Sequence, residues 1–164
     1  MTSTTSHPDS NPTEPSALID NILARFHEVH RQQLPELIRL ATQVEAVHVD
    51  HATAPHGLVA LLKSIHAELL QHMAKEETIL FPMLRRGGNP FVVHPIGVMR
   101  SEHEEHAARL AELMVLTHDA TPPEDACTTW QHLCADIKQF ADDLQQHMRL
   151  ENEVLFPLFE PIRS

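Results

Sequence analysis

The stretch Gln71-His72-Met73-Ala74-Lys75-Glu76 decides the fold, because it returns 75 positions later as Gln146-His147-Met148-Arg149-Leu150-Glu151. In both copies a histidine precedes a glutamate by four residues, and the triplet Leu-Phe-Pro follows soon after. Four residues are just over one helical turn, so each His–Glu pair projects from one face of a helix. The proline that follows each copy is expected to end its helix about one turn beyond the glutamate.

A second motif extends this repeat. His27-Glu28-Val29-His30 returns as His103-Glu104-Glu105-His106, again followed by leucines at matched spacing. The sequence therefore predicts two helix–loop–helix halves, each with a histidine on its first helix and a His-x-x-x-Glu pair on its second. Together the halves offer four imidazoles and two carboxylates, which is a ligand set for two metal ions.

The composition favours one helical domain. The chain has 164 residues, only 4 glycines and as many as 14 histidines. Its formal net charge of −11 argues against nucleic acids and anionic membranes as partners. No apolar stretch approaches the roughly 20 residues of a membrane-spanning helix, and the N-terminus carries no apolar signal region. We therefore expect a cytoplasmic protein.

Four helices are predicted from the apolar periodicity. Residues 1–15 are rich in Ser, Thr, Pro and Asn and predict a disordered polar tail, followed by a single domain over 16–160. The first helix is expected to begin at Ser16 as its N-cap and to bend at Pro35, and the second and third to span about 57–81 and 95–117. The fourth should open with the capping-box pattern of residues 121–124 and end near Phe156.

Short connections between these helices predict an all-α, up-down-up-down four-helix bundle. Counting turns from the helix ends places both His-x-x-x-Glu pairs and the two single histidines near the same end of an antiparallel bundle. The expected metal ligands are His27, His72, Glu76, His103, His147 and Glu151. Nitrogen and oxygen donors without thiolate favour iron or manganese, with zinc as an alternative.

Three further histidines could be considered for the site. His48 follows His27 by about 31 Å along a continuous helix, so we leave it out unless the chain reverses near Pro35. His30 and His106 lie one turn from ligand positions and are expected to be hydrogen-bond partners of the ligands or to line a pore. A shift in helix register would make His106 a ligand instead.

The two cysteines, Cys127 and Cys134, fall on one predicted helix. Seven residues of helix separate their Cα atoms by about 10 Å, which is too far for a disulfide. We interpret both as buried small side chains.

Longer motifs carry a family resemblance. They include Arg25-Phe26-His27, Gln33-Leu34-Pro35-Glu36-Leu37, Ser101-Glu102-His103 and Ala126-Cys127-Thr128-Thr129-Trp130. With these motifs the chain resembles, over about residues 17–158, the hemerythrin-like domain of the di-iron "repair of iron centres" proteins. The resemblance implies the same six ligands and adds a histidine at the place of His48 as a further candidate. Typical members begin with a small domain bearing a cysteine pair, and this chain has the polar tail in its place.

The resemblance also implies a function. It indicates a non-haem di-iron centre with an oxo or hydroxo bridge, which supplies iron for the repair of iron–sulfur clusters damaged by nitrosative or oxidative stress. Damaged iron–sulfur proteins would be the partners. Two alternatives remain, namely binding, scavenging or sensing of nitric oxide or dioxygen, and storage of iron. A binding or repair protein is favoured over a classical enzyme, and no catalytic residue is assigned.

Overall fold

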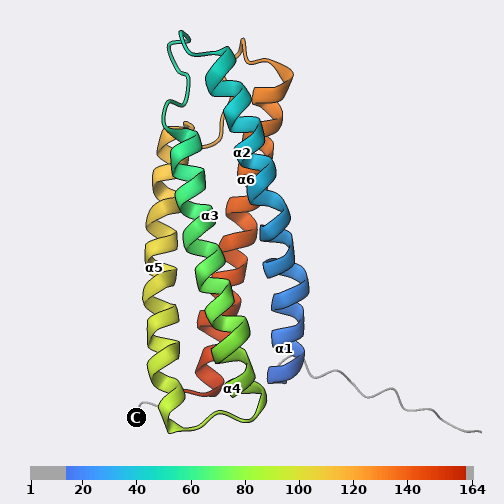
Figure 1. Cartoon of the computed structure of the whole chain (residues 1–164), viewed down its shortest axis with the longest axis vertical. Helices are drawn as coiled ribbons and strands as arrows, with labels where there is room; N and C mark the ends of the chain where they lie inside the picture. Colours follow the sequence, from blue (N-terminus) through green and yellow to red (C-terminus); the bar gives the residue numbers. More distant parts are fainter. Residues whose placement is uncertain (1–13, 162–164) are drawn as a thin grey trace, which may run out of the picture.

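Four antiparallel helical segments form the molecule in a computed structural model that describes residues 14–161. The chain runs up, down, up and down, so the predicted all-α four-helix bundle is confirmed (Figure 1). Within the described residues there is no strand, and no helix is long and apolar enough to cross a membrane. Most of the predicted tail lies outside the described residues.

The first segment is made of α1 (Pro15–Ile22), the π-helical turn η1 (Leu23–His27) and α2 (Glu28–Val47). Its N-cap is Glu14 rather than the predicted Ser16. The Glu14 carboxylate accepts hydrogen bonds from the backbone N–H groups of Ser16 at 3.1 Å and Ala17 at 2.8 Å. This acceptor satisfies two of the free N–H groups that every helix start exposes.

The remaining segments also combine long helices with short irregular turns. They comprise α3 (Leu58–Lys75), η2 (Glu76–Leu80), α4 (Phe81–Arg85), η3 (Pro90–Val92), α5 (Val93–Leu116), α6 (Thr128–Leu150), η4 (Glu151–Leu155) and η5 (Phe156–Leu158). In Figure 1 α2 lies beside α3 and α6, and α3 lies beside α5. The lower end of the bundle in this view therefore joins the end of α3 and the start of α5 to the end of α6.

Two further predicted helix boundaries are wrong. Pro82 does not end the second helix, because it lies in the first turn of α4, where its missing N–H group is not needed. The fourth helix does not open at residues 121–124 but at Thr128, with Cys127 as its N-cap. The proline pair disfavours helical backbone in the residue before each proline, which means residues 121 and 122, and residues 121–127 form a connecting loop instead.

Apolar side chains form two separate buried clusters. The larger one fills the upper and middle bundle and includes Leu34, Leu62, Leu113 and Phe140, all at most 1% exposed. The smaller one closes the lower end and consists of Leu18, Ile19, Ile22, Leu80, Phe81, Leu84, Val92, Ile96, Met99, Leu155 and Phe156. Each fully buried side chain of this kind contributes roughly 1.5–3 kcal/mol to folding. In each helical segment, a layer of buried histidines and glutamates lies along the chain between the residues of these two clusters.

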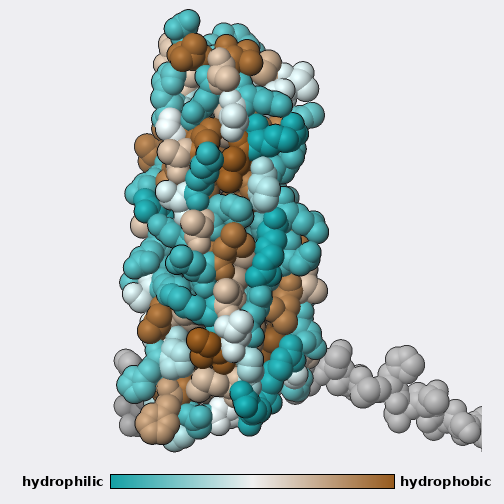
Figure 2. Space-filling model, in the orientation of Figure 1, coloured by the Kyte–Doolittle hydropathy of each residue, from teal (hydrophilic) through white to brown (hydrophobic). Residues whose placement is uncertain are grey.

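The outer surface is mostly hydrophilic. Figure 2 shows polar side chains over most of the visible face, with hydrophobic ones scattered among them. The bundle therefore buries most of its apolar side chains, and it also encloses a cluster of titratable histidines and glutamates.

Candidate metal centre

The structure brings the six predicted ligand residues together in one buried layer. They arise from all four helical segments, and none is more than 3% exposed. Their donor atoms form two groups, each with all atoms within 4.8 Å of one another: His72, Glu76, His103 and Glu151 in the first, and His27, Glu76 and His147 in the second. Glu76 belongs to both groups, so the layer offers two adjoining positions for cations.

Each carboxylate lies between two imidazoles of its own half of the chain. Oε1 of Glu76 is 3.2 Å from Nε2 of His27 and 3.2 Å from Nε2 of His72. Oε1 of Glu151 is 3.3 Å from Nε2 of His103 and 2.8 Å from Nε2 of His147. The internal repeat of the sequence is thus repeated in the geometry of the site.

Several of these buried atoms have no hydrogen-bond partner among the described residues. They are Oε2 of Glu76, Nε2 of His147 and both carboxylate oxygens of Glu151. Nε2 of His147 and Oε1 of Glu151 are 2.8 Å apart, yet the pair does not have hydrogen-bond geometry. A buried polar atom without a partner costs about 1–3 kcal/mol. Cations between these atoms would satisfy all of them, so the residues present fit a metal centre.

The outward nitrogens of three imidazoles are held by oxygen acceptors. The Nδ1 contacts are His27 to Oε2 of Glu77 at 2.7 Å, His72 to Oε1 of Glu102 at 2.9 Å, and His103 to Oδ1 of Asn152 at 2.7 Å. Because these oxygens accept, each Nδ1 carries the proton and each Nε2 keeps its lone pair directed into the site. Such contacts fix both the tautomer and the ring orientation that a metal ligand needs.

The two carboxylate partners are held in turn by cations on the helix surface. A guanidinium nitrogen of Arg31 lies 2.8 Å from Oε1 of Glu77. The ammonium group of Lys75 lies 2.7 Å from Oε2 of Glu102. Both carboxylates are therefore held in position as acceptors for the imidazoles behind them.

The fourth imidazole, His147, lies at the start of a longer series of hydrogen bonds. Its Nδ1 lies 3.1 Å from Nε2 of His30, and Nδ1 of His30 lies 3.1 Å from Oε1 of Gln33. The Gln33 amide nitrogen donates to Oδ2 of Asp143 at 2.8 Å, which also receives Arg25 on its other oxygen at 3.0 Å. Since Asp143 only accepts, every proton in this line points away from the site, and Nε2 of His147 is left free for a cation.

His106 takes no such part, although it occupies the place in the second half that His30 occupies in the first. It is 5% exposed, and its Nδ1 has no partner among the described residues. Its ring stands edge-on to His72 with 4.8 Å between the centroids. The structure thus places His30 as a hydrogen-bond partner of a predicted ligand, and His106 beside the site but outside both donor groups.

Burial keeps the imidazoles of His27 and His72 neutral, which is the form that binds metal. It lowers the pKa of His27 to about 3 and the pKa of His72 to about 4. Burial and the nearby charge of Glu151 raise the pKa of Glu76 well above its usual range. Burial also opposes ionisation of Glu151, but the imidazole of His147 lowers the pKa of Glu151 below its usual range. Without metal the two carboxyl groups therefore share one negative charge and one proton.

Three π-helical turns mark the layer, and none of them was predicted from the sequence. The backbone N–H groups of Glu28, Phe81 and Phe156 donate to the carbonyls of Leu23, Glu76 and Glu151, five residues back in each case. Such turns are rare and occur frequently at functional sites. The signal for two of them was present in the sequence, because Pro82 and Pro157 come two residues after the turns and cannot continue a regular hydrogen-bond ladder.

His48 lies outside both donor groups, at the opposite end of the first helical segment. It is the C-cap residue of α2, and its Nε2 is 3.2 Å from Sγ of Cys127. α2 continues from Glu28 to Val47 through Pro35 without reversing. The spacing argument that left His48 out is consistent with this position.

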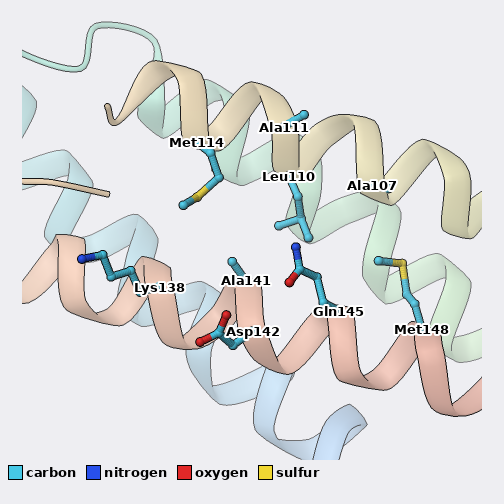
Figure 3. Close-up of a pocket in the computed structure, with 9 residues that line it drawn as sticks. All are labelled: Ala107, Leu110, Ala111, Met114, Lys138, Ala141, Asp142, Gln145 and Met148. Carbon is cyan, nitrogen blue, oxygen red and sulfur yellow. The ribbon is translucent and has the colours of Figure 1, made fainter. Parts of the chain in front are cut away.

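A groove of about 370 Å³ opens between α5 and α6, separate from the buried layer. Figure 3 shows Met114 and Met148 pointing into the space between the two helices, with Leu110 and Gln145 between them. None of the six predicted ligands lines this groove. Its lining nevertheless includes Ala107 and Met148, which directly follow His106 and His147.

Comparison with known proteins gives consistent matches along the bundle. A family model described as the hemerythrin HHE cation binding domain matches residues 18–159. Over 140 residues the chain is 49% identical to an Enterobacter sp. (strain 638) protein named iron-sulfur cluster repair protein YtfE, covering 85% of the chain and 64% of that relative. A Haemophilus influenzae protein named probable iron-sulfur cluster repair protein is 49% identical over 140 residues, covering 85% of the chain and 63% of the relative. The chain thus spans less than two thirds of the length of these curated relatives.

Proposed function

Because this chain belongs to the hemerythrin HHE cation-binding family, we propose that it supplies iron for the repair of damaged iron–sulfur clusters. The family match and the buried donor layer confirm the predicted di-iron cofactor. The assignment of individual ligands is part of the proposal. His27, His72, Glu76, His103, His147 and Glu151 would hold the two ions, and these ions are the labile iron that the protein delivers.

The observation that carries the proposal is the orientation of the four imidazoles. All four present Nε2 inward, and all four have Nδ1 occupied by a partner outside the layer. This arrangement holds the lone pairs in place before any metal arrives. The layer is therefore built to accept cations without rearrangement of its rings.

The charge balance of the layer favours the release of bound iron. Two carboxylates compensate only half of the charge of two ferrous ions, and the four neutral imidazoles compensate none. Uncompensated charge in a buried site is unfavourable, so one ion is held less firmly than a fully neutralised set would hold it. Because the pKa of Glu76 is raised, its Oε2 can take up a proton when a cation departs. This proton replaces part of the lost positive charge in the metal-free layer.

The names of the relatives support damaged iron–sulfur proteins as the acceptors of the iron. The Enterobacter and Haemophilus proteins carry names that refer to iron–sulfur cluster repair. We extend this role to the present chain and take damaged iron–sulfur proteins as its partners and the cytoplasm as its location. The formal net charge of −11 suits a carrier that collects cations and releases them to a protein acceptor.

The test is repair of a nitric-oxide-damaged iron–sulfur dehydratase under anaerobic conditions. Iron-loaded protein should restore dehydratase activity, and the Glu151→Ala variant should not, because it lacks one of the two carboxylates. The His48→Ala variant is the matched control and should repair as the parent does. If the loaded protein takes up nitric oxide as a stable nitrosyl complex and no dehydratase activity returns, the donor function fails and a scavenger or sensor takes its place.

A further inference from the structure

A second group of reactive side chains lies at the end of the bundle opposite the metal centre. It consists of His48 and His51 after α2, together with Asp125, Cys127 and Trp130 around the start of α6. Nothing in the iron chemistry uses these residues. His48, His51, Asp125 and the Cys127 thiol are all capable of proton transfer, nucleophilic attack or ligation.

The central contact is between an imidazole and a thiol. Nε2 of His48 lies 3.2 Å from Sγ of Cys127, within hydrogen-bond distance for sulfur. The His48 ring packs against the Trp130 indole with 4.9 Å between centroids, which restricts how the imidazole can turn. A nucleophile, a base within reach and a third group that orients the base are the parts of an activated cysteine.

His51 has a different task from His48. Its Nε2 lies 3.0 Å from both carboxylate oxygens of Asp125, and its Nδ1 accepts from the backbone N–H of Thr53 at 3.1 Å. Both ring nitrogens are therefore engaged. This contact ties the loop that precedes Cys127 to the end of α2, and it leaves His48 as the imidazole that serves the thiol.

The two cysteines of the chain differ sharply. The Cys127 thiol is exposed, contrary to the buried position expected from the sequence, because α6 begins at Thr128 rather than directly after Thr121. It occupies the N-cap of a 23-residue helix, and no side chain of the described residues caps that helix. Cys134 is buried, and burial raises the pKa of its thiol to about 11. Helix N-termini and neighbouring imidazoles favour thiolates, whereas apolar burial disfavours them.

We propose that Cys127 is a nucleophilic thiol, served by His48 as proton acceptor, that undergoes exchange with low-molecular-weight disulfides. The Sγ proton passes to Nε2 of His48 as the sulfur attacks one sulfur of the disulfide. A new S–S bond joins Cys127 to that half of the reagent, and the S–S bond of the reagent breaks. The departing thiolate takes the proton, so one protein thiol is oxidised and one small thiol is released.

Oxidised glutathione is the probe for this reaction. The full-length protein is incubated with it near neutral pH, and the mixed disulfide is located by peptide mass spectrometry. One glutathione should appear on Cys127 and none on Cys134. The His48→Gln variant should react roughly tenfold more slowly near neutral pH, and the difference should shrink as the pH approaches that at which a free thiol ionises. His56→Gln, at an exposed histidine of the same loop, should react as the parent does.

Two further measurements exclude a trivial explanation. In urea the parent and the His48→Gln variant should react at the same rate, since the imidazole–thiol contact no longer exists. Unchanged iron content in the His48→Gln variant would show that its bundle is intact. The proposal is overturned if native Cys127 does not react, or if His48→Gln reacts as fast as the parent over the whole pH range. It is also overturned if the only product is a disulfide between two copies of the chain. These outcomes do not depend on iron transfer, so they are independent of the proposed repair function.

Discussion

His147 and His30 face each other across α6 and α2, with Nδ1 of His147 3.1 Å from Nε2 of His30. Burial lowers the pKa of His30 to about 3, so its ring stays neutral and its Nε2 can accept the His147 proton. One imidazole thus fixes the tautomer of another. The other three imidazoles among the predicted ligands each rely on a single carboxylate or amide for the same purpose.

Replacing His30 by Leu should weaken iron binding without removing a ligand. The Nδ1–H group of His147 would lose its buried acceptor, and the ring would be free to adopt the wrong tautomer. Loss of such a partner typically lowers metal affinity about 10–100-fold. Anaerobic competition with a ferrous chelator measures this change. Gln32→Ala, at an exposed position of the same helix, is the control, and equal affinities for His30→Leu and the parent would contradict the assigned role.

The metal-free protein should lose stability on acidification, and His106 should contribute to that loss. Burial lowers the pKa of His106 from 6.5 to about 3. Between these values the unfolded chain binds a proton that the folded protein does not, so the free energy of unfolding falls as the pH drops below 6.5. For one such group the loss at pH 5.5 is roughly 1 kcal/mol.

His106→Leu should therefore flatten the pH dependence of stability. It removes the buried ring whose Nδ1 has no partner among the described residues, so stability above pH 7 should be unchanged or higher. Urea unfolding of the metal-free protein at pH 7.5 and 5.5 gives the two free energies. His132→Leu, at an exposed position of α6, is the matched control. If His106→Leu loses as much stability between these pH values as the parent, His106 is not held neutral by burial.

Ferrous iron should raise the melting temperature of the metal-free protein. Without cations the layer contains the partnerless atoms of Glu76, His147 and Glu151, each of which costs stability. Binding to the folded state alone stabilises it by mass action, about 2.7 kcal/mol at a ligand concentration one hundred times the dissociation constant. Anaerobic thermal scans with and without ferrous iron measure the shift. Superimposable scans would show that the cations bind outside the buried layer.

His48→Ala should keep both irons. The residue caps α2 at the end far from the layer, and its Nε2 contacts Cys127 rather than any predicted ligand. Elemental analysis of the purified variant, beside the parent, gives the iron content. A reduced content would mean that the family resemblance, which offered a histidine at this place, identified a ligand that the structure does not show.

The fold and the convergence of the site could be predicted because the sequence repeats itself. Two His-x-x-x-Glu pairs and two single histidines at matched spacing fix the helix faces and their depth. The partners of the imidazoles could not be predicted in the same way. Glu77 and Asn152 each follow a predicted ligand, and Glu102 precedes one, but each serves a ligand on another helix. Their roles depend on the rotation of neighbouring helices, which periodicity does not determine.

The exposure of Cys127 depended on one helix boundary. The pattern at residues 121–124 indicates a helix start, and a helix begun there would carry Cys127 in its second turn. The segment instead forms a loop with a turn at Glu124 and Asp125, the helix begins only at Thr128, and the thiol remains outside. A shift of a few residues at a helix start therefore changed the interpretation of a reactive side chain.

Anomalous diffraction at the iron edge, from crystals of the iron-loaded protein, tests the central claim most directly. It should show two iron positions inside the bundle, one among His72, His103, Glu76 and Glu151 and the other among His27, His147 and the same carboxylates. Crystals of Glu76→Ala should lose at least one of them. A single iron, or iron at His48 and Cys127 instead of the buried layer, would contradict the account.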